Sequence, residues 1–140
     1  MTYRYAPPFG LRMLQIVVLL EALARGISLI LTQQTVLAAT DVAKSAPLYV
    51  WGAVFVAFAT LGLFGEALMS GTVVDYNRPN PRAWPSFIAH AGLMILYAAL
   101  FAAYAMAVAD GSAAVASAPA AMVVFAYIHW LFARRRKHVT

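Results

Sequence analysis

The chain has 140 residues, 64% of them hydrophobic and 11% charged, with no cysteine and a formal net charge of +5. Soluble domains are about 45–50% apolar and about 25% charged, and a chain this small cannot bury so large an apolar surplus in one core. The composition therefore excludes an ordinary soluble domain and indicates a membrane protein, and the lack of cysteine excludes disulfides, thiolate catalysis and cysteine-ligated zinc or iron–sulfur sites.

The first predicted span covers about residues 11–37, which exceeds the roughly 20 apolar residues that cross a bilayer. It carries two charges, Glu21 and Arg25, one helical turn apart and in the favourable order. Glu21 follows Leu11 by about 15 Å of helix, which places it near the membrane midplane. Charges at that depth usually face protein. We therefore expect a pair that neutralises itself or that recruits another helix, and the same charges argue against a cleaved signal peptide.

Small residues four positions apart recur in three of the predicted spans. Such spacing lets two helices approach closely in a membrane. The pattern predicts tight helix packing at three pairs: Ala22 and Gly26, Ala53 and Ala57, and Ala98 and Ala102.

The second predicted span covers residues 47–69 and carries Glu66 near its inner end. Charged groups at helix ends readily reach the interface, so Glu66 is expected to face Arg12, Arg78 or Arg82. The connection that follows, residues 70–85, is the longest in the chain. Its prolines predict a loop without helix.

The third and fourth predicted spans, residues 86–108 and 116–133, each carry one histidine on the cytoplasmic side, His90 and His129. Histidines at matched depth on neighbouring helices are compatible with axial haem b ligation, or with a metal site that includes Glu66. Lone histidines near helix ends are, however, commonly ordinary hydrogen-bonding residues at the interface. The stripe that contains Tyr97 and Tyr104 has helical spacing and predicts a packing face.

The short connections predict an all-α, single-domain, up-down bundle of four transmembrane helices. Basic residues cluster at both termini and in the middle loop, whereas the other two loops hold only Lys44. The positive-inside rule then places both termini in the cytoplasm, in the inner (cytoplasmic) membrane. This distribution of basic residues follows the membrane topology, so we expect no binding to nucleic acid. We expect three interfacial tryptophans and a basic tail, residues 134–140, that binds anionic lipid head groups: Trp51, Trp84, Trp130, Arg134, Arg135, Arg136 and Lys137.

The chain lacks the GxxxxGK[ST], HExxH and GxSxG motifs, so we expect neither enzymatic activity nor a resident cofactor. The leading prediction is a protein that acts through helix–helix contacts with other membrane helices, as an accessory or assembly subunit or as a homo-oligomer. A second prediction is an ion-conducting oligomeric pore of bacterial or bacteriophage origin. In size, short loops and the basic "RRRK" tail the build resembles phage holins, and this resemblance covers architecture alone. A third prediction is a membrane anchor that binds haem b through His90 and His129.

Overall fold

The computed structural model describes residues 8–32, 40, 44–70 and 81–137 of the chain. Within these residues the regular structure is helical, with no strand. The elements are α1 (Pro8–Leu31), α4 (Leu48–Met69), the 3-10 turn η1 (Pro81–Ala83), α5 (Trp84–Ala109), the 3-10 turn η2 (Ala113–Val115) and α6 (Ala118–Lys137). Each of the four α-helices is long and apolar enough to cross a membrane. The predicted all-α character is therefore confirmed, as are four helices long and apolar enough to span a membrane.

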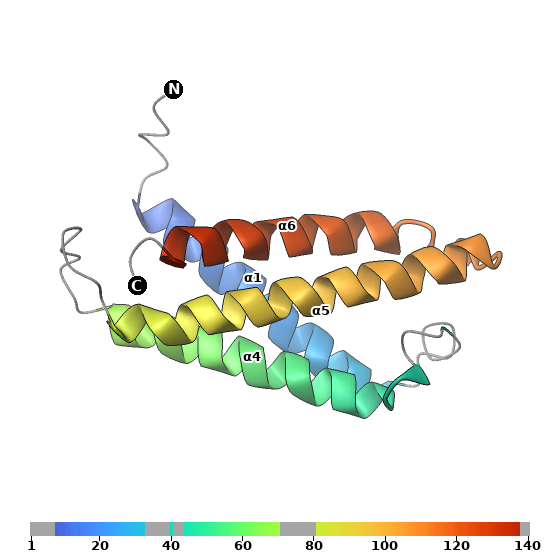
Figure 1. Cartoon of the computed structure of the whole chain (residues 1–140), viewed down its shortest axis with the longest axis horizontal. Coiled ribbons are helices and arrows are strands. Elements are labelled where there is room, and N and C mark those ends of the chain that lie inside the picture. The colour runs from blue at the N-terminus through green and yellow to red at the C-terminus, as the bar shows by residue number, and fades with distance from the viewer. Residues whose placement is uncertain (1–7, 33–39, 41–43, 71–80, 138–140) are drawn as a thin grey trace, which may run out of the picture.

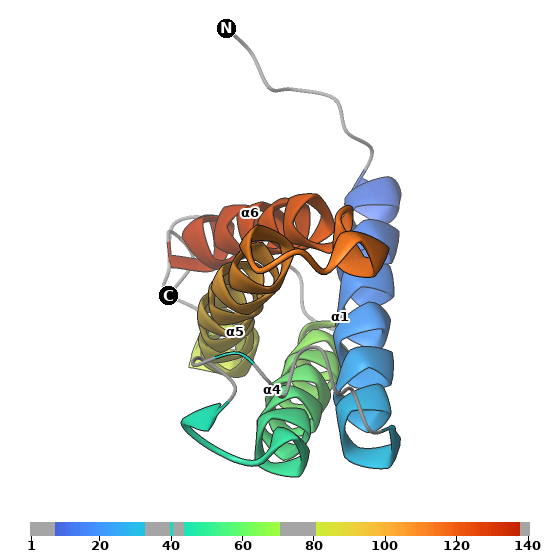
Figure 2. The same ribbon diagram turned by 90° about the vertical axis from the view of Figure 1, so that its right-hand side faces the viewer.

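Each long helix packs mainly on the next one along the chain: α1 on α4, α4 on α5, and α5 on α6. Figure 1 shows the helices passing back and forth along the long axis, with the start of α1 and the end of α6 at the same end. Figure 2 shows α1 on one side of the molecule, inclined to α5 and α6. Side chains of α1 contact both α5 and α6: Gln15 bonds to His90 of α5, and Arg25 lies over the Phe125 ring of α6.

Glycines set the closest helix contacts. A Cβ atom on Gly26 of α1 would lie 2.8 Å from the carbonyl oxygen of Gly52 on α4, and one on Gly52 would lie 2.6 Å from the carbonyl oxygen of Gly26. On the other side of α4, a Cβ atom on Gly65 would lie 2.6 Å from the backbone nitrogen of Ser86. These neighbours are backbone atoms, so α1, α4 and α5 can approach this closely only where the side chain is a hydrogen atom.

Of the three small-residue pairs predicted to pack between helices, one faces the interior. Ala22 and Gly26 are buried, but Ala53, Ala57 and Ala98 are exposed and Ala102 is only half-buried. In helices this rich in alanine, small residues occupy every face, so spacing alone does not identify the packed one. The buried small residues of α4 and α5 are instead Gly52, Ala59, Gly62, Gly65, Ala89, Ala103 and Ala107.

Helix bounds differ from the expected spans mainly at prolines. α1 begins at Pro8, while residues 33–37 of the first predicted span lie outside the described residues. The predicted loop is helical from Pro81 onward, with Pro85 in the first turn of α5. Proline fits there because the amide it lacks would have no intrahelical partner. At the other end α6 extends to Lys137, so the basic tail continues the helix.

Candidate functional site

Five polar side chains from all four helices meet inside the bundle near the end that holds the start of α1. None of them is more than 4% exposed. We call this group the inner cluster. Its members are Gln15 on α1, Glu66 on α4, Ser86 and His90 on α5, and His129 on α6.

Gln15 lies at the centre of the inner cluster. Its Nε2 donates to Glu66 Oε1 at 2.6 Å, and lies 3.2 Å from Ser86 Oγ and 2.9 Å from His90 Nε2. Ser86 Oγ also donates to Glu66 Oε1, at 2.7 Å. Because a carboxylate oxygen accepts hydrogen bonds, the amide nitrogen of Gln15, rather than its oxygen, faces Glu66. One amide side chain thus ties α1 to both α4 and α5.

The two histidines contact each other directly. His90 Nδ1 and His129 Nδ1 lie 2.8 Å apart, and the ring centroids are separated by 5.0 Å. Since Gln15 donates to His90 Nε2, the neutral His90 ring carries its proton on Nδ1 and donates it to His129 Nδ1. The neutral His129 ring then carries its proton on Nε2. That nitrogen is buried and has no hydrogen-bond partner among the described residues.

This geometry does not suit axial haem ligation. Two axial histidines must hold the iron and its porphyrin between their nitrogens, whereas the Nδ1 atoms here are in hydrogen-bond contact. The other nitrogen of His90 is taken by Gln15. Nor do the described residues contain a group of three or more histidine, cysteine or acidic side chains placed to hold a metal ion.

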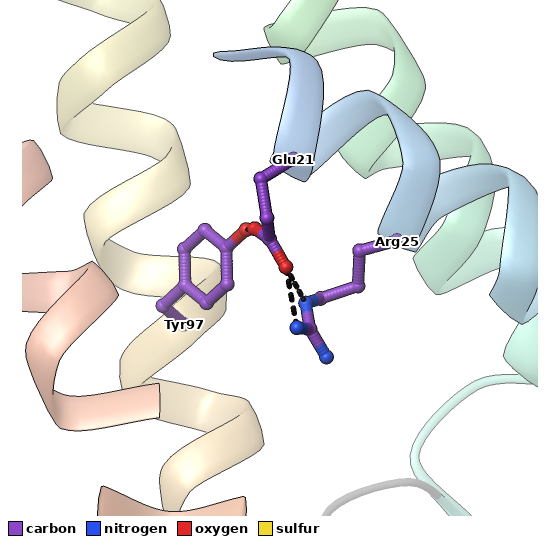
Figure 3. A network of polar contacts seen from close by, with 3 residues as sticks. All are labelled: Glu21, Arg25 and Tyr97. Atoms are coloured by element: carbon purple, nitrogen blue, oxygen red, sulfur yellow. Dashed lines mark hydrogen bonds and ion pairs between the residues drawn. The ribbon is translucent and has the colours of Figure 1, made fainter. Parts of the chain in front are cut away.

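A second polar group, the outer cluster, lies about two to three turns further along α1 and consists of Glu21, Arg25 and Tyr97 (Figure 3). Arg25 Nε donates to Glu21 Oε1 at 2.9 Å, and Arg25 Nη2 forms a second hydrogen bond to the same oxygen. The Tyr97 hydroxyl donates to Glu21 Oε2. The expected Glu21–Arg25 pair therefore forms, and its protein partner is Tyr97 of α5 rather than Glu66 or a histidine.

Aromatic rings surround the outer cluster. The guanidinium carbon of Arg25 lies 5.7 Å from the ring centroid of Tyr97 and 5.9 Å from that of Phe125 on α6. The Tyr97 ring also stacks on His129, with centroids 5.3 Å apart and planes at 15°. Tyr97 therefore joins the two clusters: it packs in the core, as its helical spacing predicts, and it also bonds to Glu21.

A cavity of about 220 Å³ adjoins the outer cluster between α1 and α5. The side chains of Glu21 and Arg25 remain 25% and 24% exposed beside it. Polar and apolar side chains share its wall: Glu21, Ala24, Arg25, Ser28, Leu29, Leu100 and Tyr104.

Glu66 is buried between the helices, whereas its place near a helix end predicts a position at the interface. It is 4% exposed and bonded to Gln15 and Ser86, and Arg12 Nη2 donates to its backbone carbonyl at 3.5 Å. Arg78 lies outside the described residues. The close approach of α4 and α5 at Gly65 explains the difference, because it draws the neighbouring Glu66 between the helices.

Sequence reasoning missed Gln15, Ser86 and the role of Tyr97. A signal was present, because Ser86, His90 and Tyr97 follow one another at intervals of four and seven residues. That spacing places them on one face of a helix. A polar face on an otherwise apolar span marks the side that contacts protein.

The expected interfacial anchors divide into two groups. Trp84 and Trp130 are exposed, and Arg134 lies over the Trp130 ring at 5.4 Å. Trp51 instead packs against the core, where its Nε1 is buried without a partner among the described residues. Arg135 is exposed, and the backbone of Arg136 and Lys137 continues α6.

Comparison of the chain with protein-family models, with curated proteins and with solved structures finds no match. The chemistry of the site therefore rests on its own side chains. These form two linked polar clusters, inner and outer, inside a four-helix membrane protein.

Proposed function

We propose that this chain is a non-enzymatic protein of the cytoplasmic membrane that acts through helix–helix contacts, as an accessory or assembly subunit or as a homo-oligomer. One observation carries the proposal: a quarter of the Glu21 and Arg25 side chains stays exposed beside the cavity. Glu21 lies at the middle of the span from Gly10 to Leu31. Charged groups exposed to hydrocarbon at that depth are costly. A neighbouring helix that brings a polar side chain to the cavity would remove the cost.

The proposal includes an up-down bundle with both termini in the cytoplasm. Its support is the distribution of basic residues, which favours the end of the bundle that holds the start of α1 and the end of α6. Trp84, Trp130 and Arg134 suit the interface at this end, because exposed tryptophan and arginine side chains prefer the head-group region.

Cross-linking tests the proposed contact directly, since the natural chain contains no cysteine. Ala24→Cys puts a single thiol at the cavity wall, and Ile95→Cys puts one on an exposed face of α5 at the middle of its span. Thiol cross-linking in native membranes should give a discrete adduct with A24C and little with I95C. A monomer on gentle purification, with no adduct at A24C, would contradict the proposal.

An oligomeric pore is the second candidate, and the polar stripe on α1 favours it. Ser28 and Thr32 continue the face of Glu21 and Arg25, and the Thr32 hydroxyl donates to the Ser28 carbonyl at 2.5 Å. Copies arranged with this stripe towards a common axis would line a polar channel. Induced expression should then collapse the membrane potential, and Glu21→Gln should change the conductance. An intact potential at high expression would count against a pore.

A further inference from the structure

Polar groups extend along nearly the full membrane thickness on the protein-facing side of α5. Ser86, His90, Tyr97 and Tyr104 follow one another at intervals of four, seven and seven residues. Ser86 and Tyr104 are about 27 Å apart at the helical rise, against a hydrocarbon core of roughly 30 Å. The first three contact titratable groups of other helices: Glu66, His129 and Glu21. The fourth lines the cavity.

We propose that this polar interior conducts protons across the membrane within a single chain. A proton enters at the Glu66 end of the inner cluster and binds His90 Nε2 when Gln15 releases that nitrogen. His90 Nδ1 passes its own proton to His129 Nδ1, and His129 Nε2 releases one towards Tyr97 and Glu21. From there the proton leaves through the cavity. Each N–H or O–H bond that breaks is matched by one that forms, so one proton leaves for each that enters and nothing is oxidised. Rotation of both imidazole rings then restores the starting tautomers for the next proton.

The tautomers of the two rings suit this transfer. The hydrogen bonds already orient the chain of donors from Gln15 through His90 to His129. It ends at His129 Nε2, whose proton meets no acceptor among the described residues. A network that served only to hold helices together would be expected to satisfy such a donor, because a buried polar group without a partner is destabilising. His129 Nε2 is therefore suited to release a proton towards the outer cluster.

One link is a ring contact rather than a hydrogen bond. His129 stacks on Tyr97 at a centroid distance of 5.3 Å, and the Tyr97 hydroxyl is bonded to Glu21. Transfer across this link needs a rotation of the imidazole or one water molecule. Conduction therefore depends on transfer from His129. Gln15, which is bonded to His90 Nε2, limits the entry of protons.

Proton flux into liposomes tests the proposal. The purified full chain is reconstituted into phosphatidylcholine–phosphatidylglycerol vesicles that contain K⁺ and a pH-sensitive dye. Valinomycin then imposes an inside-negative potential. The wild-type chain should acidify the interior several-fold faster than protein-free vesicles. His129→Phe, which keeps a ring against Tyr97 but has no nitrogen, should return the rate to that of protein-free vesicles.

Tyr127→Phe is the matched control, since Tyr127 is an exposed aromatic residue on the same helix, and it should conduct like the wild type. Glu66→Gln gives a second test should H129F fail to fold, and it should also lose the flux. A wild-type rate equal to that of protein-free vesicles overturns the proposal, as does a folded H129F or E66Q that conducts normally. The path does not rest on the proposed assembly: a monomer that conducts would contradict the assembly and support the path.

Discussion

The hydroxyl of Tyr97 on α5 donates a hydrogen bond to the carboxylate of Glu21 on α1, near the middle of both helices. This contact supplies the charge pair of α1 with a partner inside its own chain. It also joins α1 to α5, whereas α1 packs mainly against α4.

Removal of that hydroxyl should weaken the bundle without emptying its core. In Tyr97→Phe the ring still packs against Phe55 and Phe125, at centroid distances of 5.2 and 5.3 Å. Interhelical hydrogen bonds in membranes contribute about 1–2 kcal/mol in model systems, so we expect a loss of that order. Thermal unfolding in detergent measures it, with Tyr127→Phe as the exposed control. Equal melting temperatures for Y97F and the wild type would show that the hydrogen bond contributes nothing to stability.

The charge pair should behave as one unit. Arg25→Gln leaves the Glu21 carboxylate without its opposite charge, and loss of one partner of a buried pair costs about 3–5 kcal/mol. Because both side chains are partly exposed, we expect the loss of stability to lie at the bottom of that range or below it. The double variant Glu21→Gln/Arg25→Gln should recover much of the loss. Additive losses in this double-mutant cycle would mean that the two residues act independently.

The contact between Gly26 and Gly52 should not accept a methyl group. A Cβ atom on Gly52 would lie 2.6 Å from a backbone oxygen, which cannot move as a flexible side chain can. Gly52→Ala should therefore destabilise the protein by about 1–3 kcal/mol, the usual cost of overpacking. Ala53→Leu, a larger change at the exposed neighbouring residue, is the control and should be nearly neutral. Indistinguishable unfolding curves for G52A and the wild type would argue against so close an approach of α1 and α4.

The proposed orientation can be read from thiol labelling. Ala113→Cys lies in η2 between α5 and α6, and Arg135→Cys lies near the end of α6, and both positions are exposed. A membrane-impermeant maleimide should label A113C on intact cells and R135C only after permeabilisation. The reverse pattern would invert the proposed topology.

The spans could be predicted from sequence because lipid imposes length and hydrophobicity on each helix separately. The contacts of the polar residues could not, because they depend on how the helices rotate against each other. Glu66 illustrates this, since its position near a helix end suggests an interface, yet a glycine contact one residue earlier draws it inside. Tyr97 illustrates the converse, because its helical spacing fits a packing face and does not reveal the carboxylate opposite.

The inner cluster also determines which alignment of the helices is stable. The glycine contacts restrict the offsets between α1, α4 and α5, whereas α6 has no glycine and its apolar contacts discriminate less between offsets. A slip of α6 by one turn, about 5.4 Å, would separate His129 from His90 and leave two imidazole nitrogens unpaired in an apolar environment. A similar slip of α1 would detach Gln15 from Glu66 and His90 together. A few buried hydrogen bonds thus select one register from many, and a chain without them would be expected to populate several.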